Sequence, residues 1–287
     1  MRRTWRLGAL GLLLMPAAWS AEPAGAGRKP LWEFGMGVGA LGFADYRGAD
    51  SNSVYPVPVP YVVYRGRFLQ ADHNGVRGLF LDSKRVEVNL SLNATTPVRR
   101  SSRGARADMP ALRPTLEAGP SVDLHLWRSA DSRFQWDLRL PVRAAFTIEA
   151  APRRVGWLFT PHLNLDMAGS AGLVGWKLGL LVGPVFTDRR YNDYFYSVRP
   201  EFALPGRPAY QASGGYAGAQ FIASASKRFE HRWIGAFLRY DSLAGARFDD
   251  SPMVRTRRYW TAGIGIAWMI SQSQRLVDVD ALDERER

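Results

Sequence analysis

The chain has 287 residues, with 38 lysines and arginines against 26 aspartates and glutamates, and a formal net charge of +12. It contains no cysteine, which excludes disulfide bonds, a thiolate nucleophile, a Cys-ligated zinc site and a lipid-anchoring cysteine. No apolar stretch beyond the N-terminus approaches the roughly eighteen residues that a transmembrane helix needs.

The first twenty residues have the pattern of a secretory signal peptide. Three arginines precede a short apolar run, residues 7–15, and Ala18-Trp19-Ser20 then offers small residues at the usual cleavage spacing. The run is too short to cross a bilayer as a helix. We therefore predict that residues 1–20 are removed on export; a buried N-terminal helix is the alternative.

Segments in which apolar and polar residues alternate follow one another along the mature chain. In 85–93, for example, Val86 and Val88 lie on one face of a strand, and Glu87 and Asn89 lie on the other. Lengths of about nine to eleven residues match a tilted membrane-spanning strand. The predicted strands are 32–41, 59–69, 76–81, 85–93, 116–126, 134–142, 157–167, 176–186, 216–228, 233–241 and 259–269.

The connections and the aromatic residues indicate a membrane barrel. Short turns are expected at 129–132, 168–172 and 230–232, and long polar loops at 95–112, 187–213 and 242–257. Short periplasmic turns with long extracellular loops are typical of outer-membrane barrels. Large aromatic residues occur at strand ends, where two interfacial girdles would lie: Trp127, Phe134, Trp157, Trp176, Phe186, Trp233, Tyr240, Tyr259 and Trp268.

The predicted fold is all-β: a closed antiparallel transmembrane β-barrel. A soluble β-sandwich is the alternative, since its strands alternate too, but loop asymmetry and the repeated alternation favour the barrel. Eleven strands are readable and bacterial barrels have an even number, so we predict about twelve, or else ten, with blurred boundaries at 56–82. The barrel would span 21–270 in the outer membrane of a Gram-negative bacterium, followed by an acidic periplasmic tail at 271–287.

Three blocks of residues resemble the MltA-interacting protein (MipA/OmpV) family of outer-membrane proteins. The first runs from 37 to 66, the second from 183 to 215, and the third from 239 to 254, in the family's order. Arg47 and Ala49 depart from the commoner residues of the first block. The matching motif residues are Asp45, Tyr46, Gly48, Asp50, Tyr64, Arg65, Gly66, Tyr194, Phe195, Asp250, Ser251 and Pro252.

The resemblance implies a non-enzymatic scaffold that links the outer membrane to peptidoglycan synthesis and remodelling enzymes. Its implied partners are a lytic transglycosylase and a bifunctional penicillin-binding protein. The alternative, implied by OmpV-like members, is a small-solute pore or an adhesin. Family members usually end in an aromatic residue that the assembly machinery reads, whereas this chain continues beyond its last strand, so its recognition would rest on the internal Trp268.

The search for catalytic chemistry predicts no enzyme. Ser121, Asp123 and His125 share one face of a strand, but successive same-face residues are about 6.6 Å apart, too far for a hydrogen-bonded triad. His162 and Asp166 could join them in the lumen, so a lumenal enzyme that depends on His125 is a third hypothesis. The G-x-G-x-x-G match at 37–42 lacks a following helix, and the four histidines are scattered. We predict no cofactor and no metal.

Arginines gather in the predicted long loops. Because a guanidinium group pairs bidentately with phosphate, outward-facing loops could contact lipopolysaccharide; general arginine richness is the alternative. Nothing resembles a nucleic-acid recognition fold. The candidate lipopolysaccharide contacts are Arg99, Arg100, Arg103 and Arg106, and a second loop carries Arg189, Arg190, Arg199 and Arg207.

Overall fold

The computed structural model describes residues 28–50, 52–65, 69–72, 75–78, 81–83, 85–95, 104–169 and 173–278. The predicted signal peptide, the end of the predicted tail, Gly66, Arg99, Arg100 and Arg103 lie outside these ranges. Almost every described element is a strand; the exceptions are the helix α1 (Arg189–Tyr196) and the 3-10 turn η1 (Pro200–Phe202). In the described part of the chain, no helix has both the length and the apolar character needed to cross a membrane.

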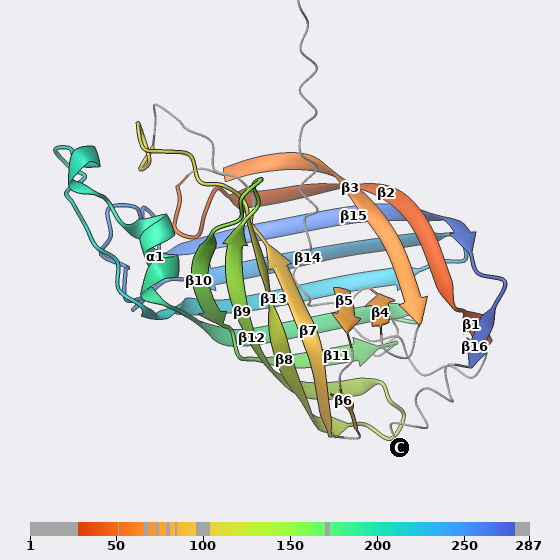
Figure 1. Cartoon of the computed structure of the whole chain (residues 1–287). Helices are drawn as coiled ribbons and strands as arrows, with labels where there is room; N and C mark the ends of the chain where they lie inside the picture. Colours follow the sequence, from red (N-terminus) through yellow and green to blue (C-terminus); the bar gives the residue numbers. More distant parts are fainter. Residues whose placement is uncertain are drawn as a thin grey trace, which may run out of the picture.

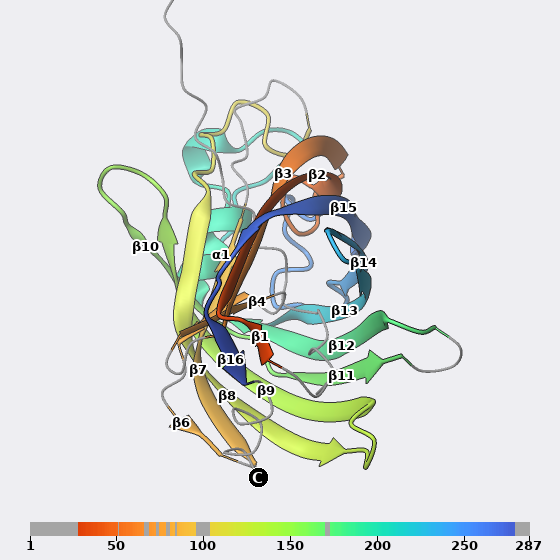
Figure 2. The same cartoon turned by 90° about the vertical axis from the view of Figure 1, so that its right-hand side faces the viewer.

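One antiparallel sheet of fourteen strands dominates the molecule and curls around an interior (Figures 1 and 2). The last long strand pairs with the first, since β15 is hydrogen-bonded to β2. The strands are β2 (Trp32–Ala44), β3 (Asn52–Arg65), β4 (Leu69–Asp72), β5 (Gly75–Gly78), β6 (Leu81–Asp82), β7 (Val86–Ala94), β8 (Thr115–Arg128), β9 (Phe134–Thr147), β10 (Arg154–Phe159), β11 (His162–Ala168), β12 (Trp176–Thr187), β13 (Gly215–Arg228), β14 (Arg232–Ser242) and β15 (Arg258–Gln272).

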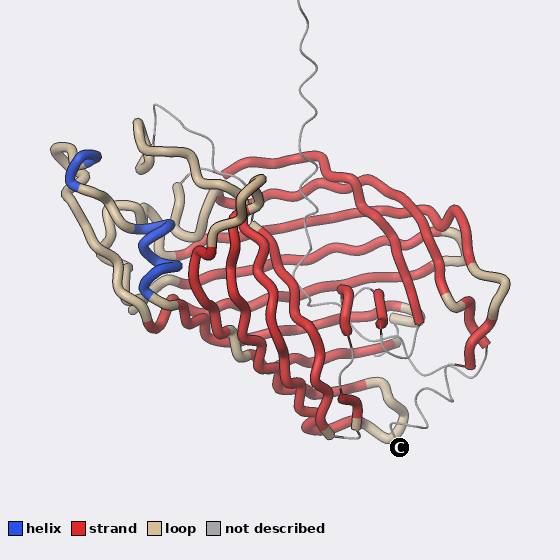
Figure 3. The backbone as a smooth tube through the Cα atoms, viewed as in Figure 1, coloured by secondary structure: helices blue, strands red, loops and turns tan. Residues whose placement is uncertain are grey.

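The two ends of the described chain meet beside this sheet. Here β1 (Arg28–Pro30) and β16 (Leu276–Asp278) form a separate two-stranded antiparallel ribbon. The short turns lie toward the same end, whereas the long loops and both helical segments gather at the opposite end (Figure 3). The predicted asymmetry between short turns and long loops is therefore present.

The predicted strand count and closure need correction. Thirteen strands follow one hydrogen-bonded path from β5 to β6, and among the described residues no ladder joins its two ends, although β5 lies beside β7. One predicted strand, 157–167, is split at Pro161 into β10 and β11, which both pair with β9 and β12. The blurred region 56–82 contains most of β3 and three short strands.

Three prolines explain why β3 has a free edge. The β2–β3 ladder is unbroken through Pro56, Pro58 and Pro60, so each proline occupies a position whose N–H group would point away from β2. A proline has no N–H group to donate, and this part of the edge cannot pair with a further strand. The only described ladder on that edge joins Tyr64 and Arg65 to β4.

The sheet buries its polar face and exposes its apolar face. On β7 and β8 the buried side chains include Glu87, Asn89 and Glu117, and those of Val38 and Ile264 are 61% and 62% exposed. In the described residues no second sheet covers the outer apolar face. This is the reverse of a sandwich, whose inner face is apolar.

The aromatic residues follow the same parity. Trp127, Trp157 and Trp268 are exposed on the outer face, as predicted for girdle residues. Trp233 and Tyr259, however, are both only 8% exposed and point inward. The girdle prediction was wrong for these two residues. Side chains on one strand an even number of positions apart share a face, and Trp233 shares the inner face with Asp241, as Tyr259 does with Gly263.

Candidate functional site

The long loops fold together into a cap at one end of the sheet. The aromatic ring of Tyr196 stacks on that of Phe248 at 3.8 Å, and the Tyr196 hydroxyl donates to the Arg47 carbonyl at 3.0 Å. The Ser251 hydroxyl in turn donates to the Tyr196 carbonyl at 2.7 Å. Residues 45–50, 104–114, 188–214 and 243–257 therefore form one packed unit.

The first and third motif blocks meet inside this cap. The Tyr46 hydroxyl donates to the Met253 carbonyl at 2.7 Å, and the Gly48 carbonyl accepts from the Arg255 backbone at 2.8 Å. Gly48 has a φ of +94°, and a Cβ atom there would lie 2.9 Å from a methyl group of Leu243. A glycine is therefore required both by the backbone conformation and by the close approach.

Helix α1 is positioned by its N-cap and by a buried face. The Asp188 carboxylate accepts a hydrogen bond from the Tyr191 backbone at 2.8 Å, which satisfies one free donor of the first turn. Tyr191 reaches inward to Glu117 at 3.1 Å, and Asn192 donates to the Ser213 carbonyl at 2.7 Å. This arrangement leaves Arg190 exposed on the other side of the helix.

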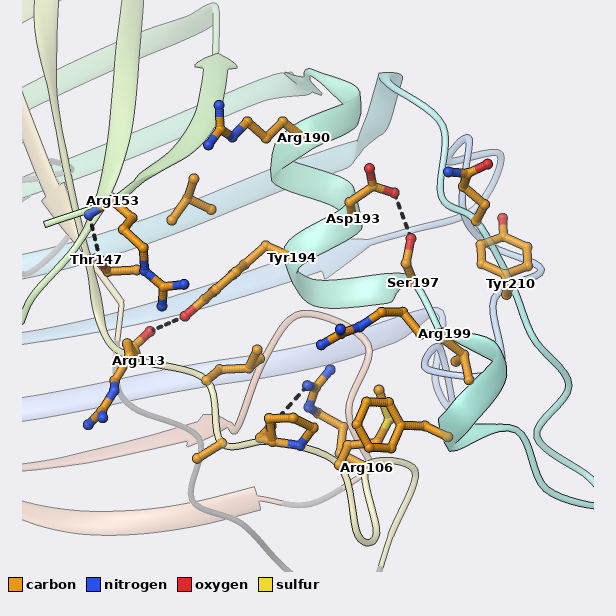
Figure 4. A pocket seen from close by; sticks show the side chains of 18 of the residues that line it. Arg106, Arg113, Thr147, Arg153, Arg190, Asp193, Tyr194, Ser197, Arg199 and Tyr210 are labelled. Atoms are coloured by element: carbon orange, nitrogen blue, oxygen red, sulfur yellow. Dashed lines mark hydrogen bonds between the residues drawn. The ribbon is translucent and has the colours of Figure 1, made fainter.

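An arginine-lined pocket opens between α1, the 104–114 loop and the β9–β10 connection (Figure 4). Its volume is about 900 Å³. Six arginines from three segments of the chain line it, with a single carboxylate, Asp193, among the lining residues. Tyr194 and Tyr210 also line it. The six arginines are Arg106, Arg113, Arg153, Arg154, Arg190 and Arg199.

The pocket holds more positive charge than its neighbouring carboxylates neutralise. Glu149 is shared by Arg153 at 2.9 Å and Arg113 at 3.7 Å. Hydrogen bonds from the Thr147 hydroxyl and the Arg153 guanidinium lower the pKa of Glu149, which keeps it ionised. Arg199 contacts Glu201 at 3.2 Å. Both pairs are largely exposed and therefore weakly stabilising.

Arg106 is held in place by backbone oxygens. Its guanidinium donates to the carbonyls of Phe195 at 3.1 Å and Pro110 at 3.2 Å. Burial disfavours the charged form of each group, so it lowers the pKa of Arg106 and raises the pKa of the Tyr194 phenol. The Tyr194 hydroxyl donates to the Arg113 carbonyl at 3.0 Å, which ties the helix to the start of β8.

Beneath the cap, ion pairs between strands cross the interior. Arg139 on β9 lies 3.5 Å from both Asp123 and Asp137 and 3.7 Å from Asp166. At the other end Glu33 pairs with Arg65 on β3 at 2.9 Å and with Arg228 on β13 at 2.7 Å.

A second set of contacts crosses the interior between β2, β3, β12, β13 and β14. Leu41 and Val59 pack in one apolar cluster with Leu181, Ile222 and Phe237. Between this cluster and the cap is a chamber of about 210 Å³. The inward-facing charges lie near partners of opposite sign, although the buried Arg139 Nε and Arg143 Nε make ion-pair contacts of 3.5 and 3.4 Å without a hydrogen bond.

The model of the MipA family, described as MltA-interacting protein MipA, matches residues 36–270. The chain belongs to this family. The match runs from within β2 to within β15 and includes the cap.

The solved structures include one similar to the chain, the outer membrane protein OprG from Pseudomonas aeruginosa. The two chains are 8% identical, and the likeness covers 85% of this chain and 95% of that one, with a TM-score of 0.22. A TM-score this low carries no argument about function. A comparison with curated proteins found no match.

The predicted motif residues fall at both ends of the sheet. Asp45, Tyr46, Gly48 and Asp50 lie at the cap, and so do Tyr194, Phe195, Asp250, Ser251 and Pro252. Tyr64 and Arg65 lie instead at the short-turn end, where Arg65 contacts Glu33 and donates to the Pro30 carbonyl at 2.7 Å. The predicted motif residues thus lie in the loop cap and at one interior ion pair.

The predicted arginine contacts have different positions in this member of the MipA family. Arg106 lines the pocket, whereas the other three candidates of its loop lie outside the described residues. Arg207 is buried and donates to the carbonyls of Phe202 and Ala107, so its role is structural. Sequence reasoning missed Arg153 and Arg154, whose available signal was an Arg-Arg pair after Pro152 in a connection between strands.

The residues considered for catalysis are not joined as a triad. The Ser121 hydroxyl donates to Asp123 at 2.6 Å, whereas His125 contacts Asp137 on β9 at 2.8 Å. His162 contacts the Thr160 carbonyl at 2.8 Å. The expectation that same-face neighbours lie too far apart to bond was wrong for Ser121 and Asp123. His125 bonds instead to Asp137, so no histidine base is aligned with the serine hydroxyl.

Proposed function

We propose that the chain is an outer-membrane β-barrel that acts as a scaffold for peptidoglycan-remodelling enzymes. The observation that carries this proposal is the network of interior ion pairs, in which Arg139 pairs with carboxylates on three strands beneath a packed loop cap. Such a network braces neighbouring strands against one another and favours a rigid wall. Membership in the MltA-interacting protein family supports a partner-binding role.

The exposed apolar face supports the membrane part of the proposal. Hydrocarbon can cover such a face, and the strands from β2 through β15 and round to β8 are paired on both edges, which satisfies their backbone groups. In this orientation the long loops face outward, and the short turns with the β1–β16 ribbon face the periplasm. Cleavage of residues 1–20 and a periplasmic tail at 271–287 belong to the same proposal.

Gel migration tests the barrel itself. Membrane fractions are loaded with and without boiling, because a folded barrel resists detergent until heated. Two mobilities in the outer-membrane fraction are expected. A single mobility, with the chain recovered in the soluble periplasmic extract, would contradict the membrane proposal.

The scaffold role is tested at the short-turn end. The proposed partners are a lytic transglycosylase and a bifunctional penicillin-binding protein, and their binding surface would include the turns at 129–132 and 229–231. Replacing these turns with glycine and serine should abolish capture of both enzymes by the tagged full chain. A matched variant with Arg247, Arg255 and Arg258 changed to glutamine alters the opposite end and should capture normally.

Two results would contradict the scaffold role. One is that neither murein enzyme is captured by the natural chain, and the other is that the turn variant and the loop variant capture them equally.

A small-solute pore is the second candidate. The chamber below the cap supports it, because residues of both charges line it, including Glu117, Arg143 and Asp241. Conductance in planar bilayers separates the candidates. Regular single-channel steps would favour the pore, whereas a silent bilayer that contains folded protein would favour the scaffold.

A further inference from the structure

The pocket beneath α1 combines a surplus of cations with few carboxylates. Arg154 and Arg190 make no ion pair among the described residues, and Arg106 contacts only carbonyl oxygens and a sulfur atom there. The one lining carboxylate, Asp193, accepts from the Ser197 hydroxyl at 2.7 Å. Guanidinium groups brought together in this way repel one another unless an anion lies between them.

The arginines approach the pocket from separate elements. Figure 4 shows the guanidinium groups of Arg106 and Arg199 close to each other on one side, and Arg113 and Arg153 on the other. Hydrogen bonds from Tyr194 to the Arg113 carbonyl and from Arg106 to the Phe195 carbonyl fix these elements relative to one another. The segments that carry the arginines are therefore fixed relative to one another before any ligand arrives, which lowers the entropic cost of binding.

We propose that this pocket binds phosphate groups carried on a sugar. The guanidinium fork matches phosphate oxygens bidentately, and several forks at one site favour a ligand with more than one phosphate. The pocket is much larger than a single phosphate ion, at about 900 Å³. The phenols of Tyr194 and Tyr210 line the same space and can pack against sugar rings and donate to their hydroxyls.

The ligand has two chemical sources. One is a phosphorylated glycolipid of the outer leaflet, which depends on the membrane orientation of the proposed function. The other is a free sugar phosphate, which does not. Both present the same chemistry to the arginines, and they are separated by experiment.

The test uses the full chain folded in detergent micelles and in lipid nanodiscs. Calorimetry in micelles compares glucose 1-phosphate with glucose. In nanodiscs, diphosphorylated lipid A is compared with the same lipid after removal of its phosphates. Binding should require phosphate in each arm and should weaken as salt is raised.

Exposed arginines are changed so that the fold is retained. In R113Q/R190Q/R199Q three pocket charges are lost, and the affinity for the phosphorylated probe should fall by about tenfold or more. The matched control R247Q/R255Q/R258Q removes three exposed charges that do not line the pocket, and it should bind within about twofold of the natural chain. Lysine at 113, 190 and 199 should restore part of the affinity, since it keeps the charge but loses the fork.

If glucose 1-phosphate binds and lipid A does not, the ligand is a free sugar phosphate. If diphosphorylated lipid A binds, the ligand is a glycolipid of the membrane. The proposal is overturned if no phosphorylated probe binds, or if the pocket variant and the control lose affinity equally. Capture of murein enzymes is measured separately, so a failed scaffold assay does not affect this result.

Discussion

The Tyr46 hydroxyl donates a hydrogen bond to the Met253 carbonyl at 2.7 Å, and this buried contact joins residues 207 positions apart. It ties the first loop of the chain to the last one. Both residues belong to the apolar cluster of the cap. Contacts between the first and the last loop of the chain therefore hold the cap together.

Replacing Tyr46 with phenylalanine should loosen the cap. The Met253 carbonyl would lose its partner while still buried, which costs about 1–2 kcal/mol. Hydrogen exchange should rise in 45–50 and 243–257 and stay unchanged in the strands. The control is Tyr55→Phe, since Tyr55 is exposed on β3. Equal exchange in both variants would show that the hydroxyl contributes nothing.

The cap should open at alkaline pH. Burial raises the pKa of Tyr46 to about 12 and also raises the pKa values of Tyr191 and Tyr196. Because these folded-state values exceed the unfolded value of about 10, their stabilisation is complete below about pH 10 and is lost as the pH rises through the folded values.

Tyrosinate absorbance measures this transition. A late-titrating group of phenols should appear near pH 12, together with faster hydrogen exchange in the cap, and Tyr46→Phe should remove one of them. Titration of every tyrosine near pH 10 with the cap intact would contradict the explanation.

The faces of the strands could be predicted from sequence because side chains alternate with a period of two. Glu87 and Asn89 are buried as the alternation required. Trp233 was assigned to a girdle because it lies at a strand end. Its even spacing from Asp241 predicts instead that it faces the interior, as the structure shows. Pro161 interrupts a predicted strand because a proline cannot donate to the ladder, and this residue was visible in the sequence.

The cap and the pocket could not be predicted in the same way. Tyr196 stacks on Phe248, and Arg106 contacts Phe195, across loops that have no regular period. Such contacts depend on how the strands place the loops in space, which a local pattern does not encode. The arginine clusters were visible in the sequence, but not which of them share one pocket.

Arg139 should be essential for the stability of the interior. In Arg139→Gln the carboxylates of Asp123, Asp137 and Asp166 lose their shared cation, and removing one partner of a buried ion pair costs about 3–5 kcal/mol. The temperature at which the folded band disappears on gels should fall well below that of the natural chain. Arg128→Gln, an exposed change on β8, should leave it unchanged. Equal temperatures for both variants would mean that solvent already screens the interior charges.

The prolines of β3 should protect its free edge from pairing with another strand. Replacing Pro56, Pro58 and Pro60 with valine restores three N–H donors on that edge and keeps apolar side chains on the outer face. The variant should form dimers or larger species through this edge, since an unpaired row of donors and acceptors recruits a second strand. Cross-linking in micelles measures the change, and Pro208→Val, in an exposed loop, is the control. A variant that stays as monomeric as the natural chain would show that the β3 edge is already blocked by other parts of the molecule.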